Sequence, residues 1–486
     1  MCKHKAPFSF GLPTVNNPTI DVTLRDELND LLDPLGQSHV LQFWDELSGE
    51  QKNDLANQIR GIDWETFATL TSGNGGEPDW ESLAARAVAP PAISLDQLRE
   101  PAIRGQAIRR GSNAIAGGQV AFVLTAGGQG SRLGFEFPKG MFPIGPVSGR
   151  SLFQILIEHT MARGRQCGTS IPIYVMTSPQ TDRETNEYLQ AKQWFGYPPE
   201  DIKTFCQGVI PAVDAQTKQV LLESKSQIFA NPDGHGGALA ALARSGSLAD
   251  MKRRGIEHVF YGQIDNPLLQ ICDPTLIGNH LLHQSEMTTQ VVRKRDPLQR
   301  VGNVVKIDGR VQIIEYSDLP DSAAQQKTAD GGLKLWAGSI AVHVFDLRFL
   351  ERCNSNPQSL PFHRAAKKVD CVDSAGRSFR PQSPNAIKFE RFIFDLLPQA
   401  ERAIVCEVDP AEGFAAVKNS EPAQTETPSW VQRAMVRLHT SWLVQAGAVV
   451  APGTPIEINP AFALDTEQAA SRIRPGQKFE RPTYLC

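Results

Sequence analysis

A glycine-rich loop with two cationic side chains follows a short apolar run in the first third of the chain. The run Ala121–Leu124 predicts a buried parallel strand, and a glycine cluster occupies positions 127–130 directly after it. Glycine backbone can turn its N–H groups toward a ligand, and Arg132 and Lys139 carry the positive charge that suits a phosphate. Because Pro138 disfavours a helix here, the chain should approach Lys139 in an extended form. Together these residues predict a cradle for a nucleoside triphosphate.

Two better-known phosphate loops do not match this stretch. The dinucleotide fingerprint requires a third glycine where Leu133 stands, and the Walker A loop requires Ser or Thr where Gly140 follows Lys139. A tight glycine turn without a ligand is the remaining alternative. The presence of Arg132, and of Lys139 after Pro138, favours ligand binding over that alternative.

The composition describes an ordinary globular chain. Its 486 residues allow two or three domains, and a net charge of −4 gives no electrostatic case for a nucleic-acid partner. No stretch has the length and apolarity of a membrane span, and no export signal follows the first residues, so no membrane partner is expected. The eight cysteines are scattered without zinc spacing, which favours reduced thiols. These features predict a cytoplasmic protein.

The chain is expected to fold as an α/β protein in three parts. Residues 1–100 should form a helical N-terminal region, in which Ser48 and Gln51 have the spacing of a capping box. Residues 101–395 should form the central nucleotide-binding domain. Residues 396–486 should form a small C-terminal domain with an amphipathic helix that ends near Gly447. The tail has no hexapeptide periodicity, so a fused β-helical acetyltransferase domain is not expected.

Strands and helices alternate from Gln119 onward, which is typical of an α/β sheet. In such sheets ligands bind beyond the carboxyl ends of the strands, so the loops after Thr125, Cys206 and Ile264 should converge on one crevice. The expected elements are strands at 171–176, 202–206, 258–264 and 335–345, helices from Ser151 and Asp182, and a β-hairpin over 301–316 that turns at Asp308 and Gly309.

Polar side chains and further glycines follow several of these strands. Gln207 and the glycine-rich turn from Asn231 to Gly237 offer an amide and backbone groups that could pair with a uracil ring. Asp265 stands at a strand end, and one carboxylate suffices for a Mg²⁺ whose other ligands are phosphate oxygens and waters. Each of these features taken alone is more often an ordinary turn.

The glycine loop carries a family resemblance. The segments Leu124-Thr-Ala-Gly-Gly-Gln-Gly-Ser-Arg-Leu-Gly134 and Pro138-Lys-Gly-Met141 resemble the loop of eukaryotic-type UDP-N-acetylhexosamine pyrophosphorylases, which belong with the UDP-sugar pyrophosphorylases. The likeness extends in separate blocks from about Gly105 to about Trp442. It implies a Rossmann-like, GT-A-like nucleotidyltransferase domain with a mixed sheet. It also implies that UTP and a sugar 1-phosphate are converted to a UDP-sugar and pyrophosphate, with Mg²⁺ (or Mn²⁺) as cofactor.

The resemblance also implies roles for residues in the matching blocks. Arg132, Lys139 and Lys418 would neutralise the reacting phosphates, and Asp265 would hold the metal. The nucleotide would be bound by Ala126, Gly127, Gly128, Gln207, Pro232, Gly234 and His235. The sugar would contact Gly302, Glu315, Tyr316, Ser339, Phe392 and Phe394.

Two positions depart from the family pattern. His235 stands where the animal enzymes usually carry Asn, and Ser339 replaces an Asn expected at the sugar. A hydroxyl cannot reproduce the donor and acceptor pair of an amide. A UDP-glucose or broad-specificity UDP-sugar pyrophosphorylase therefore stays open beside an N-acetylhexosamine enzyme. A non-catalytic UDP-sugar sensor is the alternative of another class, and the intact cationic residues and Asp265 argue against it.

Overall fold

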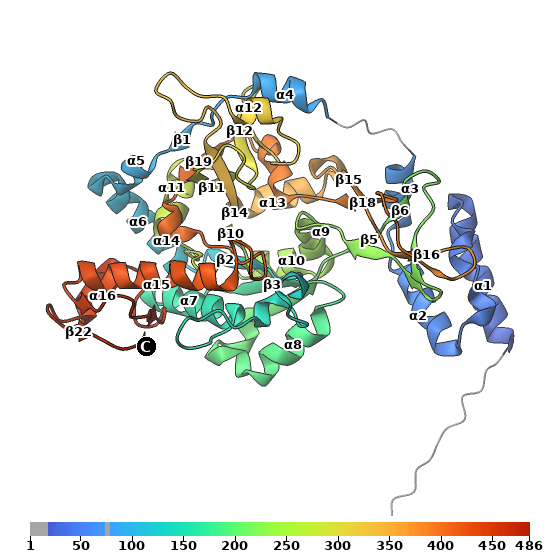
Figure 1. The fold of residues 1–486 in the computed structure, drawn as a ribbon, viewed down its shortest axis with the longest axis horizontal. Helices are drawn as coiled ribbons and strands as arrows, with labels where there is room; N and C mark the ends of the chain where they lie inside the picture. The colour runs from blue at the N-terminus through green and yellow to red at the C-terminus, as the bar shows by residue number, and fades with distance from the viewer. Residues whose placement is uncertain (1–17, 73–77) are drawn as a thin grey trace, which may run out of the picture. The chain divides into compact units, whose positions relative to one another are not determined.

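A ten-stranded sheet organises the larger part of the molecule (Figure 1). The computed structural model describes residues 18–72 and 78–486. The main path of the sheet has the order β1-β19-β11-β14-β10-β2-β3-β4, and the hairpin β12–β13 joins it at β14. Its strands are β1 (Ala92–Ile93), β2 (Val120–Thr125), β3 (Ile173–Thr177), β4 (Ile202–Cys206), β10 (His258–Gln263), β11 (Met287–Arg293), β12 (Asn303–Ile307), β13 (Arg310–Ile314), β14 (Ala337–Asp346) and β19 (Ala403–Glu407).

The glycine loop leaves a strand at the parallel centre of this sheet. Strands β10, β2, β3 and β4 are parallel neighbours, whereas β14 runs antiparallel to both β10 and β11. Every residue of β2 is buried: Phe122 and Leu124 belong to one apolar cluster, and Ala121 and Val123 to the other. Neighbouring side chains point to opposite faces of a strand, so both faces of the sheet are covered. The expected α/β fold with a mixed sheet is confirmed.

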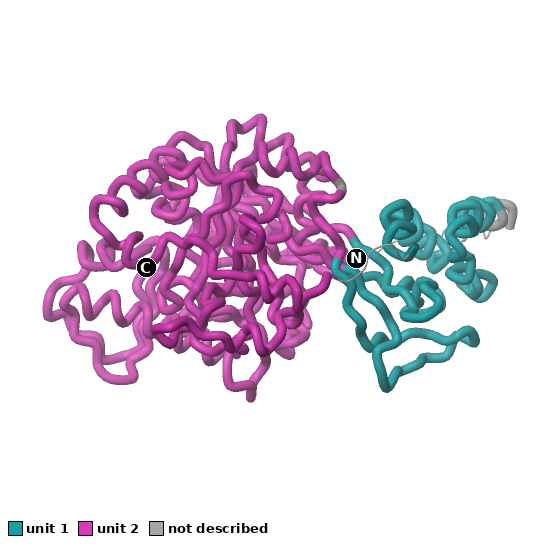
Figure 2. The backbone as a smooth tube through the Cα atoms, turned by 90° about the horizontal axis from the view of Figure 1, so that it is seen from above, with its two compact units in different colours: residues 1–76, 209–231, 363–389 teal, residues 77–208, 232–362, 390–486 magenta. Residues whose placement is uncertain are grey.

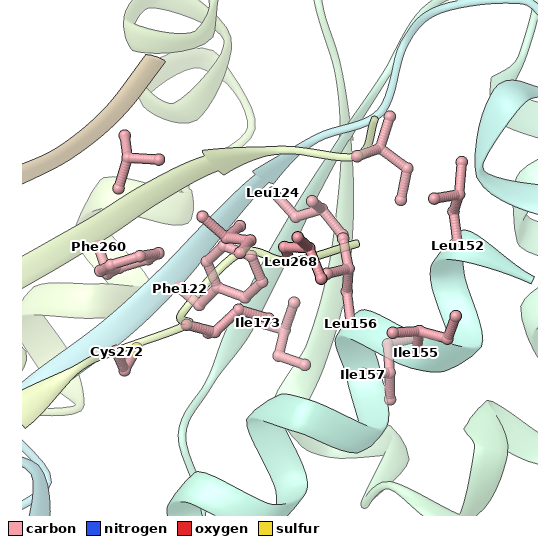
Figure 3. Close-up of a cluster of buried hydrophobic side chains, with 14 of the residues drawn as sticks. Phe122, Leu124, Leu152, Ile155, Leu156, Ile157, Ile173, Phe260, Leu268 and Cys272 are labelled. Atoms are coloured by element: carbon pink, nitrogen blue, oxygen red, sulfur yellow. The ribbon is translucent and has the colours of Figure 1, made fainter. Parts of the chain in front are cut away.

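Helices supply the cover on the two faces. The cluster drawn in Figure 3 packs Leu152 and Leu156 of α7 against Phe122, Ile173 and other residues of the sheet. Burial of each such side chain stabilises the fold by about 1.5–3 kcal/mol. The helices of this part are α4 (Trp80–Arg86), α5 (Leu95–Arg99), α6 (Pro101–Ala116), α7 (Leu152–Gln166), α8 (Asp182–Ala191), α9 (Gly237–Arg244), α10 (Ser247–Arg253), α11 (Pro274–Leu282), α12 (Asp321–Ala324), α13 (Leu347–Asn354), α14 (Pro410–Gly413), α15 (Pro428–Gln445) and α16 (Thr466–Arg472).

Several local predictions are confirmed. Asp308 and Gly309 both have positive φ (50° and 85°), as a type I′ hairpin turn requires. Ser48 and Gln51 form the expected capping box at the start of α2 (Gly49–Arg60). Helix α15 ends two residues before Gly447, which has φ 86°. Beyond α15 the chain forms the short strands β20 (Val449–Val450), β21 (Ile456–Ile458), β22 (Lys478–Phe479) and β23 (Thr483–Leu485).

The chain divides into two compact units that alternate along the sequence (Figure 2). The smaller unit takes residues 1–76, 209–231 and 363–389, and the larger unit takes the rest. The division at 100 and 395 stays a prediction. None of the described helices is long and apolar enough to cross a membrane. Besides α2, the elements lying wholly or mainly in the smaller unit are α1 (Pro18–Leu32), α3 (Trp64–Thr71), β5 (Val209–Pro211), β6 (Val213–Asp214), β7 (Leu222–Ser224), β8 (Gln227–Ile228), β9 (Ala230–Pro232), β15 (His363–Lys367), β16 (Cys371–Val372), β17 (Ser378–Phe379) and β18 (Ala386–Glu390).

Candidate active site

Three loops meet at the carboxyl edge of the parallel strands. The N–H of Ile264, after β10, donates to the carbonyl of Thr125 at the end of β2 (3.0 Å). The N–H of Gln207, after β4, donates to the carbonyl of Thr177 at the end of β3 (3.0 Å). Parallel neighbours place their carboxyl ends at the same edge of a sheet. The loops after Thr125, Cys206 and Ile264 therefore lie at one edge of the sheet, as expected, and the crevice between them stays a prediction.

The first residues of the glycine loop pack against an amide side chain. Ala126 is buried, and its N–H donates to the carbonyl of Met176 (2.8 Å), so it supports the loop from the sheet. A Cβ atom on Gly127 would lie 2.9 Å from Gln207 Nε2 and 3.2 Å from the carbonyl carbon of Thr177, which explains glycine there. Gln207 is buried, and its Oε1 has no hydrogen-bond partner among the described residues. Buried acceptors are normally paired. This one suits the N–H of a uracil, and that role stays a prediction.

The far end of the loop returns to the glycines and carries Lys139 with it. The N–H of Lys139 donates to the carbonyl of Gly128 (3.0 Å). This closure places the Lys139 Nζ atom 3.4 Å from Oδ2 of Asp265. Both side chains are largely buried, with exposed fractions of 16% and 13%. Lys139, predicted to bind the phosphates, and Asp265, predicted to hold the metal, are thus direct neighbours. Solvent screens their charges less here than it would at the surface.

The loop from Gly413 to Val417 is tied to the end of β10. The N–H of Val417 donates to the carbonyl of Asp265 (2.9 Å). Asn266 is buried: its Nδ2 donates to the carbonyl of Gly413 (2.8 Å), and its Oδ1 accepts from a backbone N–H within the loop (3.0 Å). Lys418 follows Val417 directly, so these bonds bring its backbone toward Asp265. The sequence pattern predicts only a turn at Asn266 and does not reveal this anchoring role.

Three predicted site residues lie in more open positions. Arg132, in the short turn of 3₁₀ helix Ser131–Leu133, is exposed. Tyr316 is 49% exposed. The Lys418 side chain is 37% exposed, and its Nζ lies 3.9 Å from a carboxylate oxygen of Glu426. Such side chains are accessible to an incoming polyanion, and their roles stay predictions.

Four of the six residues predicted for the sugar lie at the ends of the hairpin strands (Gly302, Glu315 and Tyr316) and on β14 (Ser339). The N–H of Ser339 donates to the carbonyl of Gly302 (2.8 Å), and a Cβ atom on Gly302 would lie 3.0 Å from Oε1 of Glu315. The structure therefore brings Gly302, Glu315 and Ser339 together. Because β14 runs antiparallel to β10, with His343 opposite Tyr261, the beginning of β14 extends toward the edge that carries Asp265.

His235 belongs to an aromatic wall formed with Phe392 and Phe394. Its ring centroid lies 5.4 Å from that of Phe392 and 5.5 Å from that of Phe394, and the two Phe rings stack at 5.0 Å. The turn that carries His235 begins at Pro232, and Gly234 within it has φ 81°, a conformation that favours glycine. A residue predicted for the nucleotide thus lies with two predicted for the sugar.

Comparison with known proteins shows the family of this chain. The model of the family described as UTP–glucose-1-phosphate uridylyltransferase matches residues 89–468, which is most of the chain. The chain belongs to this family. As a uridylyltransferase it is a nucleotidyltransferase enzyme, which favours catalysis over the alternative of a silent sensor.

Several relatives of this uridylyltransferase have names that specify the sugar as N-acetylglucosamine or N-acetylhexosamine. The UDP-N-acetylglucosamine pyrophosphorylase of Saccharomyces cerevisiae is 33% identical over 466 residues, which cover 92% of this chain and 96% of the yeast protein. The human UDP-N-acetylhexosamine pyrophosphorylase-like protein 1 is 34% identical over 427 residues, which cover 85% of this chain and 84% of the human protein. The UDP-N-acetylglucosamine pyrophosphorylase of Trypanosoma brucei, solved in complex with an inhibitor, has a TM-score of 0.80 at 26% identity and covers 92% of this chain and 94% of its own.

The uridylyltransferase also has a buried lysine that the sequence pattern does not reveal. Lys294, at the end of β11, is 5% exposed, and its Nζ donates to Oδ1 of Asn303 (2.5 Å) and to the carbonyl of Pro297 (3.4 Å). Its Cγ lies 3.2 Å from the position of a Cβ atom on Gly338, next to Ser339. Burial lowers the pKa of Lys294 to about 8, against the smaller opposing effect of a nearby carboxylate. Lys294 therefore packs against Gly338, next to a residue predicted to contact the sugar.

Proposed function

We propose that this uridylyltransferase makes UDP-N-acetylhexosamine and pyrophosphate from UTP and an N-acetylhexosamine 1-phosphate. The names of the yeast and Trypanosoma brucei relatives, which cover more than nine-tenths of this chain, support N-acetylglucosamine as the sugar. In the proposed reaction a phosphate oxygen of the sugar phosphate attacks the α-phosphorus of UTP in line. The bond from the α-phosphorus to the bridging oxygen breaks, and pyrophosphate leaves.

One observation carries the proposal: the Lys139 ammonium and the Asp265 carboxylate lie 3.4 Å apart at the carboxyl edge of the sheet. The attacking phosphate is already anionic, so the reaction requires no Ser, Cys or His nucleophile and no strong base. The difficulty is to bring two polyanions together and to neutralise them in the transition state. A partly buried cation beside a carboxylate that can hold a metal meets that need.

The cationic residues divide this task. Lys139 would bind the α-phosphate and the sugar phosphate, Arg132 would hold the departing phosphates, and Lys418 would reach the phosphates from the loop tied to Asp265. Loss of one such cation costs about 3 kcal/mol of transition-state stabilisation, by analogy with the donors of an oxyanion hole.

A divalent cation, Mg²⁺ or Mn²⁺, would be held by Asp265. Among the described residues there is no cluster of three or more His, Cys, Asp or Glu side chains that could enclose a metal. The carboxylate of Asp265 is 13% exposed and lies beside Lys139 just after β10. It fits an ion that takes its remaining ligands from phosphate oxygens and waters. When bound, the ion would supply positive charge that neutralises the phosphate oxygens.

A broader sugar specificity is the second candidate, and two residues favour it. Ser339 presents one hydroxyl beside Gly302, where the family pattern has an amide. His235 adds an imidazole to the aromatic wall of Phe392 and Phe394. Both changes alter the hydrogen-bonding groups near the sugar, so glucose 1-phosphate and other sugar 1-phosphates are candidate substrates as well. We propose the cytoplasm as the compartment, in line with the scattered free cysteines.

The test is pyrophosphate release by the full chain with UTP, Mg²⁺ and a panel of sugar 1-phosphates. We expect kcat/KM to be highest with N-acetylglucosamine or N-acetylgalactosamine 1-phosphate. A preference for glucose 1-phosphate would replace the N-acetylhexosamine assignment by the second candidate. Release with none of the sugars would contradict both.

A further inference from the structure

Two excursions of the chain leave the larger unit and return to it at one place. The larger unit stops at Gly208 and resumes at Pro232, and it stops again at Phe362 and resumes at Glu390. Within the larger unit, the N–H of Asp233 donates to the carbonyl of Gly208 (3.1 Å), which ties the two ends of the first excursion. The ends of the second excursion are held in a similar way.

Arg391 makes the corresponding contacts at the second excursion. Its guanidinium lies 4.5 Å from the centre of the Phe362 ring, a cation–π arrangement. Its N–H donates to the carbonyl of Asp233 (2.8 Å), and its own carbonyl accepts from the N–H of Gly236 (2.8 Å). Asp233 and Arg391, which lie 158 positions apart in the sequence, thus join the two pairs of chain ends.

The two side chains also form an ion pair. Oδ2 of Asp233 accepts a hydrogen bond from Nη2 of Arg391, and the side chains are 5% and 18% exposed. A Cβ atom on Gly237 would lie 1.9 Å from Oδ1 of Asp233, and one on Gly234 would lie 2.4 Å from the carbonyl oxygen of Arg391. Only glycine leaves room at both positions. The turn is therefore built around the pair. Loss of Arg391 would leave the buried Asp233 carboxylate with only the smaller electrostatic effect of Arg244 to offset its charge.

Asp233 and Arg391 are each adjacent in the sequence to residues that are predicted to bind a substrate. Asp233 stands between Pro232 and the turn with His235, and its backbone contacts Gly208, which follows Gln207. Arg391 precedes Phe392 of the aromatic wall, and the N–H of the next residue, Ile393, donates to Nδ1 of His235 (3.3 Å). The ion pair therefore lies between the surface predicted for the uridine and the wall predicted for the sugar.

We propose that Asp233 and Arg391 are a positioning pair. The pair would hold the turn from Pro232 to Gly237, which is predicted to bind the uridine, at a fixed distance from Phe392 and Phe394. The inference rests on the proposed function, because it takes UTP and the sugar 1-phosphate as the molecules that span the two surfaces. Neither residue needs to touch a substrate. Their effect comes from keeping the aromatic wall, including His235, correctly placed relative to the glycine loop. A displacement of about 1 Å can cost a factor of 100 in rate.

The test uses Asp233→Asn and Arg391→Met in the full chain. Asp233→Asn keeps the size of the side chain and so guards against loss of the fold. We expect each variant to raise KM for UTP and KM for the sugar 1-phosphate together, so that kcat/KM falls by about 100-fold. Arg391→Lys, which keeps the charge, should restore most of this loss. The matched control is Arg150→Met, which breaks the ion pair of Arg150 with Glu158 (25% and 15% exposed) in the same unit.

The readouts separate positioning from stability alone. Arg150→Met should lower Tm and leave both KM values unchanged. Asp233 and Arg391 variants that lower Tm but keep both KM values would overturn the proposal, as would a change in KM for only one substrate. Calorimetric titration of wild type and variants with UTP and with UDP-N-acetylglucosamine tests the positioning pair separately from the proposed reaction. A wild type that binds both but releases no pyrophosphate would refute the proposed function, while weaker binding of both by the variants would still support the pair.

Discussion

The Lys139 ammonium lies 3.4 Å from the Asp265 carboxylate, although the two residues are 126 positions apart in the sequence. The contact forms because β2 and β10 are parallel neighbours, so the loops that leave their carboxyl ends lie side by side. Both groups are largely buried, which strengthens the interaction of either with a phosphate or a metal compared with the same groups at the surface.

Replacement of Lys139 by Met should abolish most of the turnover. The change removes a largely buried cation whose charge the transition state needs, so kcat should fall by about 10²–10³-fold. The affinity for the UDP-sugar product should change far less. The measurements are steady-state kinetics of pyrophosphate release and calorimetric titration with the UDP-sugar. Lys252→Met is the control, because Lys252 is 69% exposed and pairs with Glu351. Equal losses of kcat and of product affinity would contradict the assigned role.

Replacement of Asp265 by Asn should weaken the dependence of activity on Mg²⁺. The amide keeps the shape of the side chain but lacks the negative charge that a hard divalent cation prefers. We expect the Mg²⁺ concentration for half-maximal activity to rise by at least about tenfold, since changes even beyond the direct ligands cost that much. Asp273→Asn is the matched control: Asp273 caps helix α11 through the N–H groups of Thr275 and Leu276, and Asn is an equally good cap. An unchanged Mg²⁺ titration for Asp265→Asn would refute the metal assignment.

Much of the fold could be predicted because its signals are local. The apolar run before the glycine loop predicts a buried strand, and β2 is buried at every position. The residue types of Asp308 and Gly309 favour a tight turn in any surroundings, because both tolerate the positive φ that they adopt here. Ser48 and Gln51 cap a helix through bonds that span three residues. Such features depend on neighbouring residues alone, so one sequence is enough to recognise them.

The pairings of the site could not be predicted in the same way. The contact of Lys139 with Asp265 depends on the order of strands in the sheet, which no local pattern determines. Asp233 and Arg391 lie 158 positions apart in the sequence, and each alone has the pattern of a surface charge. Lys294 follows an arginine and precedes another, which predicts a solvated face, yet it is 5% exposed. Burial of these charges is a tertiary effect.

Alanine substitutions at two neighbouring glycines should have different effects. At Gly128 a Cβ atom would meet nothing within 4 Å, so Gly128→Ala should leave the free energy of unfolding unchanged within about 0.5 kcal/mol. At Gly127 the Cβ atom would press on Gln207 and on the backbone of Thr177, so Gly127→Ala should destabilise the fold. Both should raise KM for UTP, because the methyl group would occupy space that the phosphates need. Urea unfolding and kinetics check the two effects. An unchanged KM for Gly128→Ala would show that the loop does not close on the nucleotide.

Replacement of Lys294 by Met should remove a pH dependence of stability. Burial lowers the pKa of Lys294 from its ordinary 10.5 to about 8. Between these two values the unfolded chain binds more protons at this residue than the folded protein does, so the free energy of unfolding rises with pH across that window. Below about pH 8 the residue is charged in both states, and its cost to the fold is constant.

The measurement is the free energy of urea unfolding for both proteins at several pH values. Subtraction of the Lys294→Met curve from the wild-type curve cancels the other titrating groups. The difference should be flat below the pKa of Lys294 and should then rise in favour of the wild type toward about pH 10. Asp296 is the acid whose charge opposes the shift, so Asp296→Asn should move the onset of the rise to lower pH. A difference that stays constant across this range would mean that water reaches the ammonium, and Lys294 would then not be buried against Gly338.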